Sequence, residues 1–485
     1  MDTKKLRQKI LDLAIHGKLV PQNPNDEPAS VLLERIRAEK ERLVKEGKIK
    51  KSKATKTSDT PHYENVPFEV PSSWEWTTLG ELCSIKGGKR IPKGKTFSKE
   101  KTEHIYLRVT DMKDNTIVMS DLKYIDDDVY NEIKNYIINS SDLYLTIAGT
   151  IGAVGIVPDL FDGMNLTENA AKLTNILCDK MYLMYSLLST IAQEHFSSRF
   201  HQVAQPKLSI ETASKTLLPL PPIEEQQRIV AETERWFALI EQIEQGKTDI
   251  QTAIKQTKSK ILDLAIHGKL VPQDPNDEPA TELLKRINPK AEITCDNGHY
   301  QNLPKGWCTT SIKNICDNIN GLWKGKKDPF INVGVIRNAN FTKDFKLDYS
   351  NIEYIDVEQR AFSQRHLKNG DLIIEKSGGS DNYPVGRAIL YEGKDELYSF
   401  SNFTMVLRIK DKNIISSKFL YYFLLDKYKK GVMRTMQTQT TGLHNLILDK
   451  YLSMELCIPP YSEQKRIIDA IEELFDKLDA IMESL

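Results

Sequence analysis

Residues Lys9–Ile36 read KILDLAIHGKLVPQNPNDEPASVLLERI, and Lys260–Ile287 read KILDLAIHGKLVPQDPNDEPATELLKRI. The two stretches differ at only four of 28 positions, with a constant offset of 251 residues. The sequence that follows the first copy is very dissimilar to the sequence that follows the second. The near-identity therefore predicts two places in the molecule that meet the same neighbour.

A second, shorter motif is also duplicated. Leu220–Ile229 reads LPPIEEQQRI and Ile458–Ile467 reads IPPYSEQKRI. Proline cannot continue a helix or a central strand, so each Pro-Pro pair ends the element before it. Glu225 and Glu463 then fall in a first helical turn, where the helix macrodipole favours a carboxylate. Each motif therefore predicts a helix start.

The helices that follow carry a heptad pattern, because their apolar positions recur in alternating steps of four and three. No proline interrupts residues 224–271, so the central copy predicts one helix of about 45 residues, roughly 65 Å long. A helix with this pattern most often packs in a core. A seam of this length nevertheless needs a long partner helix.

The two ends of the chain hold the same pieces in split form, so termini that meet would rebuild a second copy of the central helix. We therefore predict an α+β fold with pseudo-twofold symmetry. Two long antiparallel, coiled-coil-like helices would separate two mixed α/β domains. The expected parts are an N-terminal helical segment (1–45) that completes the second helical region, a linker (46–63), a first domain (64–218), a central helical region (219–290), a second domain (291–456) and a C-terminal helix (457–485).

The two domains open alike, with VPSSWEWTTLGELCSIKGG beside LPKGWCTTSIKNICDNING, so that Trp74 matches Trp307. Both contain short apolar runs punctuated by glycine, which are typical of strands. Their remaining residues have diverged. This combination predicts one fold that is used twice to meet two different targets.

Composition restricts the class of protein. The 67 basic and 67 acidic residues cancel, which disfavours a nonspecific polyanion binder but allows basic residues to gather on one surface. Six cysteines without a CxxC motif indicate neither a disulfide framework nor a zinc site. The sequence shows neither an apolar run of ~20 residues nor a secretory signal, so we expect a cytoplasmic protein.

The chain resembles, over essentially its whole length, the specificity (S) subunit of type I restriction–modification enzymes. The features that carry the resemblance are the paired ILDLAIHGKLVPQ(N/D)PNDEPA segments, the paired PP-x-x-E-Q-x-R-I helix starts and the two Trp-led domains. The resemblance implies that each domain is a target recognition domain for one half of a bipartite, asymmetric double-stranded DNA site. It implies that the helices bind two methyltransferase subunits and that restriction–translocase subunits complete the complex. S-adenosylmethionine would then belong to the methyltransferase subunits, and ATP and Mg to the restriction subunit.

The sequence offers little evidence of catalysis in this chain. GGKRIPKGKT approaches a P-loop, but five residues rather than four separate Gly88 from Gly94. The glycines of residues 149–155 are expected in tight strand turns. His16 and His267 precede glycines that fit helix ends, and they have no partner at ligand spacing. We therefore expect a non-catalytic subunit without a cofactor or metal of its own.

Basic residues in glycine-rich stretches are candidates for phosphate contact, because such a loop can approach the DNA backbone closely. In the first domain they are Lys86, Lys89, Arg90, Lys93 and Lys95. In the second they are Lys324, Lys326 and Lys327. A solvated loop is the alternative interpretation.

Amide and cationic side chains near the domain ends are candidates for contacts with base edges, since Gln or Asn can pair with adenine and Arg with guanine. In the first domain they are Arg199, Gln202, Gln205 and Lys207. In the second they are Arg434, Gln437, Gln439 and Asn445.

The repeated segments are candidates for binding the partner subunits, because stability alone would not keep surface-type residues such as PNDEPA nearly constant. The candidates are Leu13, His16, Leu19, Glu225 and Gln226 in one copy and Leu264, His267, Leu270, Glu463 and Gln464 in the other. An alternative of another class is a non-enzymatic, protein-binding assembly scaffold without DNA readout. The neutral net charge favours that alternative and the paired basic loops oppose it.

Overall fold

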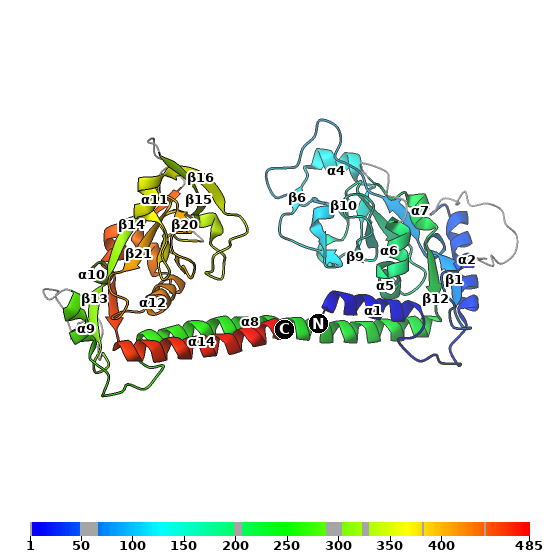
Figure 1. Cartoon of the computed structure of the whole chain (residues 1–485). Coiled ribbons are helices and arrows are strands. Elements are labelled where there is room, and N and C mark those ends of the chain that lie inside the picture. The colour runs from blue at the N-terminus through cyan, green and yellow to red at the C-terminus, as the bar shows by residue number, and fades with distance from the viewer. Residues whose placement is uncertain are drawn as a thin grey trace. The chain divides into compact units, whose positions relative to one another are not determined.

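The computed structural model describes residues 2–48, 66–197, 206–287, 303–322, 329–380, 383–440 and 443–485. The chain divides into two compact units, Met1–Gly246 and Lys247–Leu485, and the division falls within helix α8 (Figure 1). Helix α8 (Ile223–Ile266) has 44 residues and is about 66 Å long at 1.5 Å per residue. The predicted long, uninterrupted central helix is therefore confirmed.

Unit 1 builds its domain from small sheets. The largest run of antiparallel pairs follows the order β2 (Ser84–Gly87), β11 (Ala170–Thr174), β8 (Leu143–Thr146), β9 (Val154–Ile156). A second sheet follows the order β6 (Lys123–Tyr124), β3 (Ile105–Leu107), β10 (Met164–Leu166), β7 (Ile137–Ile138), in which β3 and β10 are parallel. Two further antiparallel pairs are β1 (Glu75–Thr78) with β12 (Leu217–Leu220), and β4 (Met112–Lys113) with β5 (Thr116–Ile117).

Unit 2 repeats this topology. Its antiparallel sheet has the order β14 (Cys316–Asn320), β21 (Thr404–Ile409), β17 (Leu372–Glu375), β19 (Ala388–Leu390). Its mixed sheet has the order β16 (Glu353–Glu358), β15 (Phe330–Ile336), β20 (Tyr398–Phe400), with β15 and β20 parallel. The pair β13 (Cys308–Ser311) and β24 (Glu455–Ile458) matches β1 and β12. A third sheet joins β18 (Ser377–Gly379), β23 (Leu443–Leu446) and β22 (Gln437–Thr440). The mixed α/β character predicted for both domains is confirmed.

Helices cover these sheets and connect them. In unit 1 the α-helices besides α8 are α1 (Thr3–Ile15), α2 (Ala29–Lys45), α3 (Leu79–Leu82), α4 (Asp127–Ile133), α5 (Lys180–Leu188), α6 (Thr190–Ser197) and α7 (Ile210–Ser214). In unit 2 they are α9 (Ala280–Ile287), α10 (Ile312–Ile315), α11 (Gln359–Arg365), α12 (Ser417–Lys429), α13 (Leu448–Leu452) and α14 (Tyr461–Ser484). The short 3-10 helices are Val109–Asp111, Asp159–Phe161, Asn338–Asn340 and Val432–Met436.

In each unit one terminal helix runs antiparallel to part of α8. In unit 1, Thr3 at the start of α1 forms a hydrogen bond with Glu244, whereas the guanidinium of Arg7, one turn later, lies 5.1 Å from the ring centre of Phe237. In unit 2, Lys247 of α8 contacts Leu485 at the end of the chain, and Lys258 Nζ lies 2.6 Å from the carboxylate of Asp479 in α14. Rising residue numbers on one helix therefore meet falling numbers on the other.

The predicted heptad seam of α8 is only half buried. Ile240, Ile254 and Ile261 are 1%, 5% and 7% exposed, whereas the alternate line of Trp236 and Ile243 is 39% and 40% exposed. The seam prediction is corrected in this respect: along the middle of α8 one apolar line packs and the other is exposed, although Ile229, at the start of that second line, is buried.

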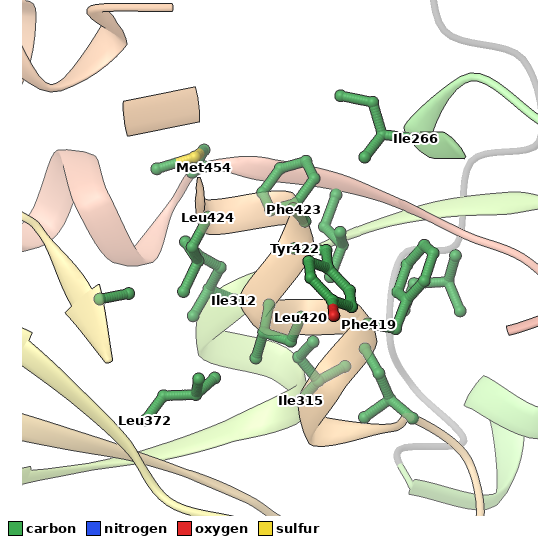
Figure 2. Packing of buried hydrophobic residues seen from close by; sticks show 14 of the residues in the cluster. Ile266, Ile312, Ile315, Leu372, Phe419, Leu420, Tyr422, Phe423, Leu424 and Met454 are labelled. Atoms are coloured by element: carbon green, nitrogen blue, oxygen red, sulfur yellow. The ribbon is translucent and has the colours of Figure 1, made fainter. Parts of the chain in front are cut away.

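The core of unit 2 forms around α12, whose apolar residues face both the sheet and the long helix. Figure 2 shows side chains of α12 gathered with residues of α10, β17 and α8, and the labelled members are Ile266, Ile312, Ile315, Leu372, Phe419, Leu420, Tyr422, Phe423, Leu424 and Met454. In unit 1, α5 supplies the matching buried residues, including Leu183 and Leu187. Each domain is thereby packed firmly onto its own stretch of α8. Within the described ranges, no helix combines the length and apolar character needed to cross a membrane.

Candidate nucleic-acid interface

The two duplicated motifs meet each other within each unit. In unit 1, α1 ends at Ile15, and Gly17 follows with φ +65°, a left-handed conformation that glycine adopts without strain. The amide of Lys18 donates to the carbonyl of Leu13 at 2.9 Å, which completes a Schellman ending. A Cβ on Gly17 would lie 2.5 Å from Pro71 Cγ, so the domain packs directly against this turn. The predicted helix-terminating glycine is confirmed.

A buried carboxylate joins the motifs beside this turn. Trp74 Nε1 donates to Glu225 Oε2 at 3.0 Å, and Gln22 Nε2 donates to Glu225 Oε1 at 3.0 Å. Next to them, Arg228 lies 2.5 Å from Asp26, whose side chain is only 5% exposed. The long repeat, the short repeat and the domain therefore share one polar network.

Unit 2 contains the same network. Trp307 Nε1 and Gln273 Nε2 each donate to the carboxylate of Glu463 at 3.1 Å, and Arg466 lies 2.6 Å from Asp277. Burial raises the pKa of Glu463. We refer to these two sets of contacts as the repeat lock. Its members are Gly17, Gln22, Asp26, Trp74, Glu225 and Arg228 in unit 1, and Gly268, Gln273, Asp277, Trp307, Glu463 and Arg466 in unit 2.

The repeat lock corrects part of the expected partner surface. Glu225 and Glu463 are each 1% exposed, and Gln226 and Gln464 are each 0% exposed. The amide of Asp179 donates to Gln226 Oε1 at 2.9 Å, and the equivalent bond from Ser416 to Gln464 measures 2.8 Å. These four side chains are occupied inside the chain, so they do not offer a surface to another subunit. Asp26 and Asp277, within the PNDEPA loops, are likewise held internally, so the surface-type character assigned to them is also corrected.

The remaining partner candidates lie nearer the surface of the same turns. Leu13, Leu19 and His16, with their counterparts Leu264, Leu270 and His267, are all partly buried. The ring of His16 stacks on Phe68 at 3.8 Å between centroids. Their role toward a partner stays a prediction.

A second polar link ties the repeated helix to the domain. In unit 2, Lys430 Nζ lies 2.7 Å from Asp263 Oδ1, and this hydrogen bond lowers the pKa of Asp263 to about 2. In unit 1, the equivalent Asp12 accepts a hydrogen bond from Thr190 Oγ1 at 2.9 Å. The repeated aspartate therefore has a structural partner in both units.

The basic stretch of unit 1 emerges where β2 crosses to the second sheet. A Cβ on Gly88 would lie 2.2 Å from the carbonyl oxygen of Thr167, and the amide of Lys89 donates to the carbonyl of Leu166 at 2.8 Å. Arg90 Nε lies 3.5 Å from Glu168 Oε1, and Lys207 Nζ lies 3.4 Å from the backbone oxygen of the same residue. The structure thus brings the side chains of Arg90 and Lys207 together at Glu168, whereas the ammonium of Lys89 lies 5.6 Å from the ring centre of Tyr136.

The other candidates of this stretch are more scattered. Lys86 lies on β2 and is exposed, and Lys93 is exposed in the loop that follows. Lys95 pairs with Asp128 of α4, and the hydrogen bond that Lys95 donates to this carboxylate raises the pKa of Lys95. The charge of Lys95 is therefore partly offset. Arg199, Gln202 and Gln205 lie outside the described residues.

In unit 2 the described candidates gather near the third sheet. Gln437 and Gln439 lie on β22, Asn445 lies on β23, and Arg434 lies in the preceding 3-10 helix. Gln437 Oε1 accepts a hydrogen bond from the amide of Val385 at 3.3 Å. Asn445 is hydrogen-bonded to Ser377 of β18. The basic candidates Lys324, Lys326 and Lys327 lie outside the described residues.

Lys207 and Asn445 occupy equivalent places. In unit 1, Lys207 bridges to Ala148 just after β8, and in unit 2, Asn445 pairs with Ser377 just after β17. The next residues donate matching bonds: Leu208 to the carbonyl of Ile147 and Leu446 to that of Lys376, both at 2.8 Å. The two domains therefore present one backbone frame with different side chains at this edge.

The turns that follow the parallel strands β3 and β15 were missed by the sequence analysis. Arg108 and Arg337 each precede a 3-10 turn, and their amides donate to Asp111 Oδ2 at 2.8 Å and to Asn340 Oδ1 at 2.9 Å. These turns contain no lysine, so they do not carry the basic, glycine-rich pattern that indicates phosphate contact. The matching pattern of an apolar residue, arginine and a polar turn, RVTD beside RNAN, is the signal that could have found them.

A pocket of about 460 Å³ lies beside the turn of unit 2. The ends of β15 and β20 and the crossing after β14 form its walls, as expected for a site at the carboxyl ends of parallel strands. It is lined by Leu322, Val335, Arg337, Asn338, Ala339, Glu353, Ile355, Ser401, Asn402 and Phe403. Arg337 is paired with Glu353, which leaves the amides of Asn338 and Asn402 and the hydroxyl of Ser401 as the neutral polar side-chain groups there.

The glycine-rich stretch after β8 forms a turn between two strands. Residues 147–153 connect the antiparallel strands β8 and β9, and Gly149 and Gly152 have φ +79° and +88°. The tight strand turn predicted there is confirmed. Among the residues that the structure describes, no group of three or more His, Cys, Asp and Glu side chains is arranged to hold a metal ion.

Comparisons with known proteins agree with this duplicated architecture. The model of the family "Type I restriction modification DNA specificity domain" matches residues 71–252 and again residues 304–485. The chain is 29% identical to the type I restriction enzyme EcoAI specificity subunit of Escherichia coli, over 97% of this chain and 88% of that protein. It is 26% identical to the EcoEI specificity subunit of Escherichia coli, over 99% of this chain and 90% of the relative.

A solved structure shares the fold. A chain from work on the "structural basis underlying complex assembly and conformational transition of the type I R-M system" superposes with a TM-score of 0.55 at 18% identity, over 86% of this chain and 94% of that one. The family match occurs twice, once in each unit, and together the two segments span most of the chain. The chain belongs to the type I restriction–modification DNA specificity family.

Proposed function

We propose that this chain is the specificity subunit of a type I restriction–modification complex and that each unit reads one half of a bipartite, asymmetric site in double-stranded DNA. The observation that carries the proposal is the shared backbone frame with different side chains at equivalent positions, such as Lys207 and Asn445. One fold used twice with unlike side chains suits a target with two unlike halves. Phosphate contacts from residues such as Lys89 and Arg90 would position the duplex, and base contacts would select the sequence.

The partners follow from the same proposal. Two methyltransferase subunits would dock on the helical parts, one at each copy of the repeated turn, and restriction–translocase subunits would complete the complex in the cytoplasm. The repeat lock supports a pseudo-twofold arrangement, because the same contacts occur in both units. The proposed division of the chain is that predicted from the sequence: 1–45, 46–63, 64–218, 219–290, 291–456 and 457–485. The partly exposed Leu13, His16 and Leu19 and their counterparts are the docking candidates.

The catalytic steps belong, in this proposal, to the partner subunits. S-adenosylmethionine would bind the methyltransferase subunits, and ATP and Mg the restriction subunit, while this chain supplies register and sequence choice. A base that is methylated must leave the stack to enter a catalytic pocket. The specificity subunit would therefore hold the duplex so that each methyltransferase meets its own target base.

The test is the adenine-methylation pattern of the host genome with and without this gene. Loss of one two-part motif on deletion is the expected result, and it would reveal both half-sites. An unchanged pattern, in cells that express the chain and its methyltransferase, would overturn the proposal and favour the protein-binding scaffold without DNA readout.

A further inference from the structure

We propose that three pairs of equivalent positions, Val109/Asn338, Glu168/Asn402 and Lys207/Asn445, determine which bases each unit recognises. This inference rests on the proposed function and deepens it. It assigns base choice to the edge where the parallel strands end, rather than to the lysine-rich loops.

The backbone at these positions is built alike in the two units. Val109 and Asn338 are the first residues of the matching 3-10 turns. Glu168 and Asn402 each follow the end of the parallel strand β10 or β20 by two residues. Matching bonds hold the strand ends: Lys89 donates to the carbonyl of Leu166 and Leu322 donates to that of Phe400, each at 2.8 Å.

Close packing prevents this frame from shifting. A Cβ on Gly88 would lie 2.2 Å from the carbonyl oxygen of Thr167, and one on Gly321 would lie 1.9 Å from that of Ser401. The backbone that precedes Glu168 and Asn402 is therefore in contact with the crossing segment in both units. Variation at this edge is confined to side chains, which is the arrangement required for changing sequence preference without changing the fold.

The side chains at the edge differ in hydrogen-bonding chemistry. Unit 1 presents Glu168, an acceptor, and Lys207, a donor, whereas unit 2 presents amides at all three positions. In the major groove a carboxylate suits the amino group of cytosine, a lysine suits guanine, and an amide suits adenine. The two units are therefore equipped to choose different bases.

The pocket of unit 2 supports a ligand at this edge. Asn338 Nδ2 donates to the backbone oxygen of Ser377 at 2.5 Å, so the amide is held in one orientation. Its Oδ1 is buried and has no hydrogen-bond partner among the residues that the structure describes. A buried acceptor without a donor is rare in folded proteins, and a base with an exposed amino group would supply one after a small adjustment of the pocket. Phe403, 44% exposed at the pocket rim, offers an apolar surface to the same ligand.

Isosteric substitutions test the inference, because they reverse hydrogen-bonding polarity without changing volume. Asn402→Asp in unit 2 and Glu168→Gln in unit 1 would be introduced into the full chain and expressed with its methyltransferase in cells that lack the native gene. The control is Asn413→Asp, an exposed position in the segment beyond the opposite end of β21. Methylated motifs would be determined by genome sequencing, and the assembled complex would be purified to measure its amount and its thermal stability.

We expect Asn402→Asp to change the base preference at one or two adjacent positions of one half-site, with methylation at the original sites reduced about tenfold or more. Glu168→Gln should alter the opposite half, and the control should leave both halves unchanged. Unchanged motifs in both variants would overturn the inference. So would an equal loss of methylation at all sites in a stably assembled complex. If Asn402→Asp fails to assemble, the smaller Asn402→Ala replaces it, with relaxed choice in the same half as the expected result. A wild-type chain that directs no two-part motif would instead refute the proposed function.

Discussion

Replacing Gly17 with alanine tests how closely the repeat lock is packed. Its φ of +65° costs a non-glycine residue about 1 kcal/mol. The added Cβ would lie 2.5 Å from Pro71 Cγ and 3.3 Å from Trp74 Cζ2. Forced displacement in a packed region costs about 1–3 kcal/mol, so Gly17→Ala should destabilise unit 1 by about 2–4 kcal/mol.

Gly47 provides a matched control in the same unit. It follows α2 with φ +72°, and its amide donates to the carbonyl of Val44 at 3.0 Å, much as Gly17 follows α1. A Cβ on Gly47 would meet no atom of the described structure within 4 Å. Gly47→Ala should therefore cost only the backbone contribution, about 1 kcal/mol. The difference between the two variants isolates the packing of the lock.

The assay is hydrogen–deuterium exchange on the full chain, followed at the slowest-exchanging amides of unit 1, because a two-unit chain has no single unfolding temperature to compare. Each 1.4 kcal/mol changes the opening equilibrium tenfold, so Gly17→Ala should increase exchange roughly 30- to 700-fold and Gly47→Ala roughly fivefold. Gly268→Ala should act in the same way on unit 2, since its Cβ would lie 2.4 Å from Pro304 Cγ. Equal effects of Gly17→Ala and Gly47→Ala would refute the close-packed lock.

Three further predictions concern charged groups. Arg228→Ala leaves the nearly buried carboxylate of Asp26 without its cation. The opening free energy of unit 1, measured by the same exchange experiment, should therefore fall by about 1–3 kcal/mol. A fall of less than about 0.5 kcal/mol would contradict this. If the ammonium of Lys89 contacts one phosphate, Lys89→Ala in the assembled complex should flatten the slope of log DNA affinity against log salt concentration by about 0.9. The slope would be measured by fluorescence anisotropy, and an unchanged slope would exclude Lys89 from the DNA interface. The hydrogen bond from Lys430 lowers the pKa of Asp263 to about 2, below its ordinary value, so the pair stabilises unit 2 above about pH 4 and its contribution is lost as the pH falls toward 2. Asp263→Asn should lower the stability of unit 2 by about 0.5–1 kcal/mol at pH 7, with a difference that shrinks below pH 4, whereas a constant difference would contradict the assignment.

Local signals in the sequence were sufficient for the helical framework. Pro-Pro followed by an acidic first turn predicted the starts of α8 and α14, and the absence of proline predicted the length of α8. The glycines after His16 and His267 marked helix ends, because only a residue tolerant of positive φ suits that place. Each of these features depends on neighbours within a few residues, so pattern alone can identify it.

Predictions were less successful where they depended on which side of a helix is buried by the rest of the chain. The heptad pattern predicts one continuous seam, yet Trp236 and Ile243 are exposed while Ile240 is buried. A periodic apolar pattern shows that two lines exist on a helix, but the partner that covers either line comes from elsewhere in the chain. For the same reason the sequence alone could not place Val109 beside Gly149 in unit 1, or Asn338 beside Ser377 in unit 2.

The sequence by itself determined that the molecule is duplicated, that its framework includes a long helix, and that two related domains carry different side chains. Only the tertiary structure decided what the duplication is for. Glu225 is separated from Trp74 by 151 positions and from Gln22 by 203, and the three become one buried network only when the domain packs on the helices. Burial is a property of such distant pairings rather than of residue type. The polar residues that looked like a shared partner surface are therefore part of a shared internal lock. Equivalent backbone positions at the edge where the parallel strands end carry different side chains in the two units.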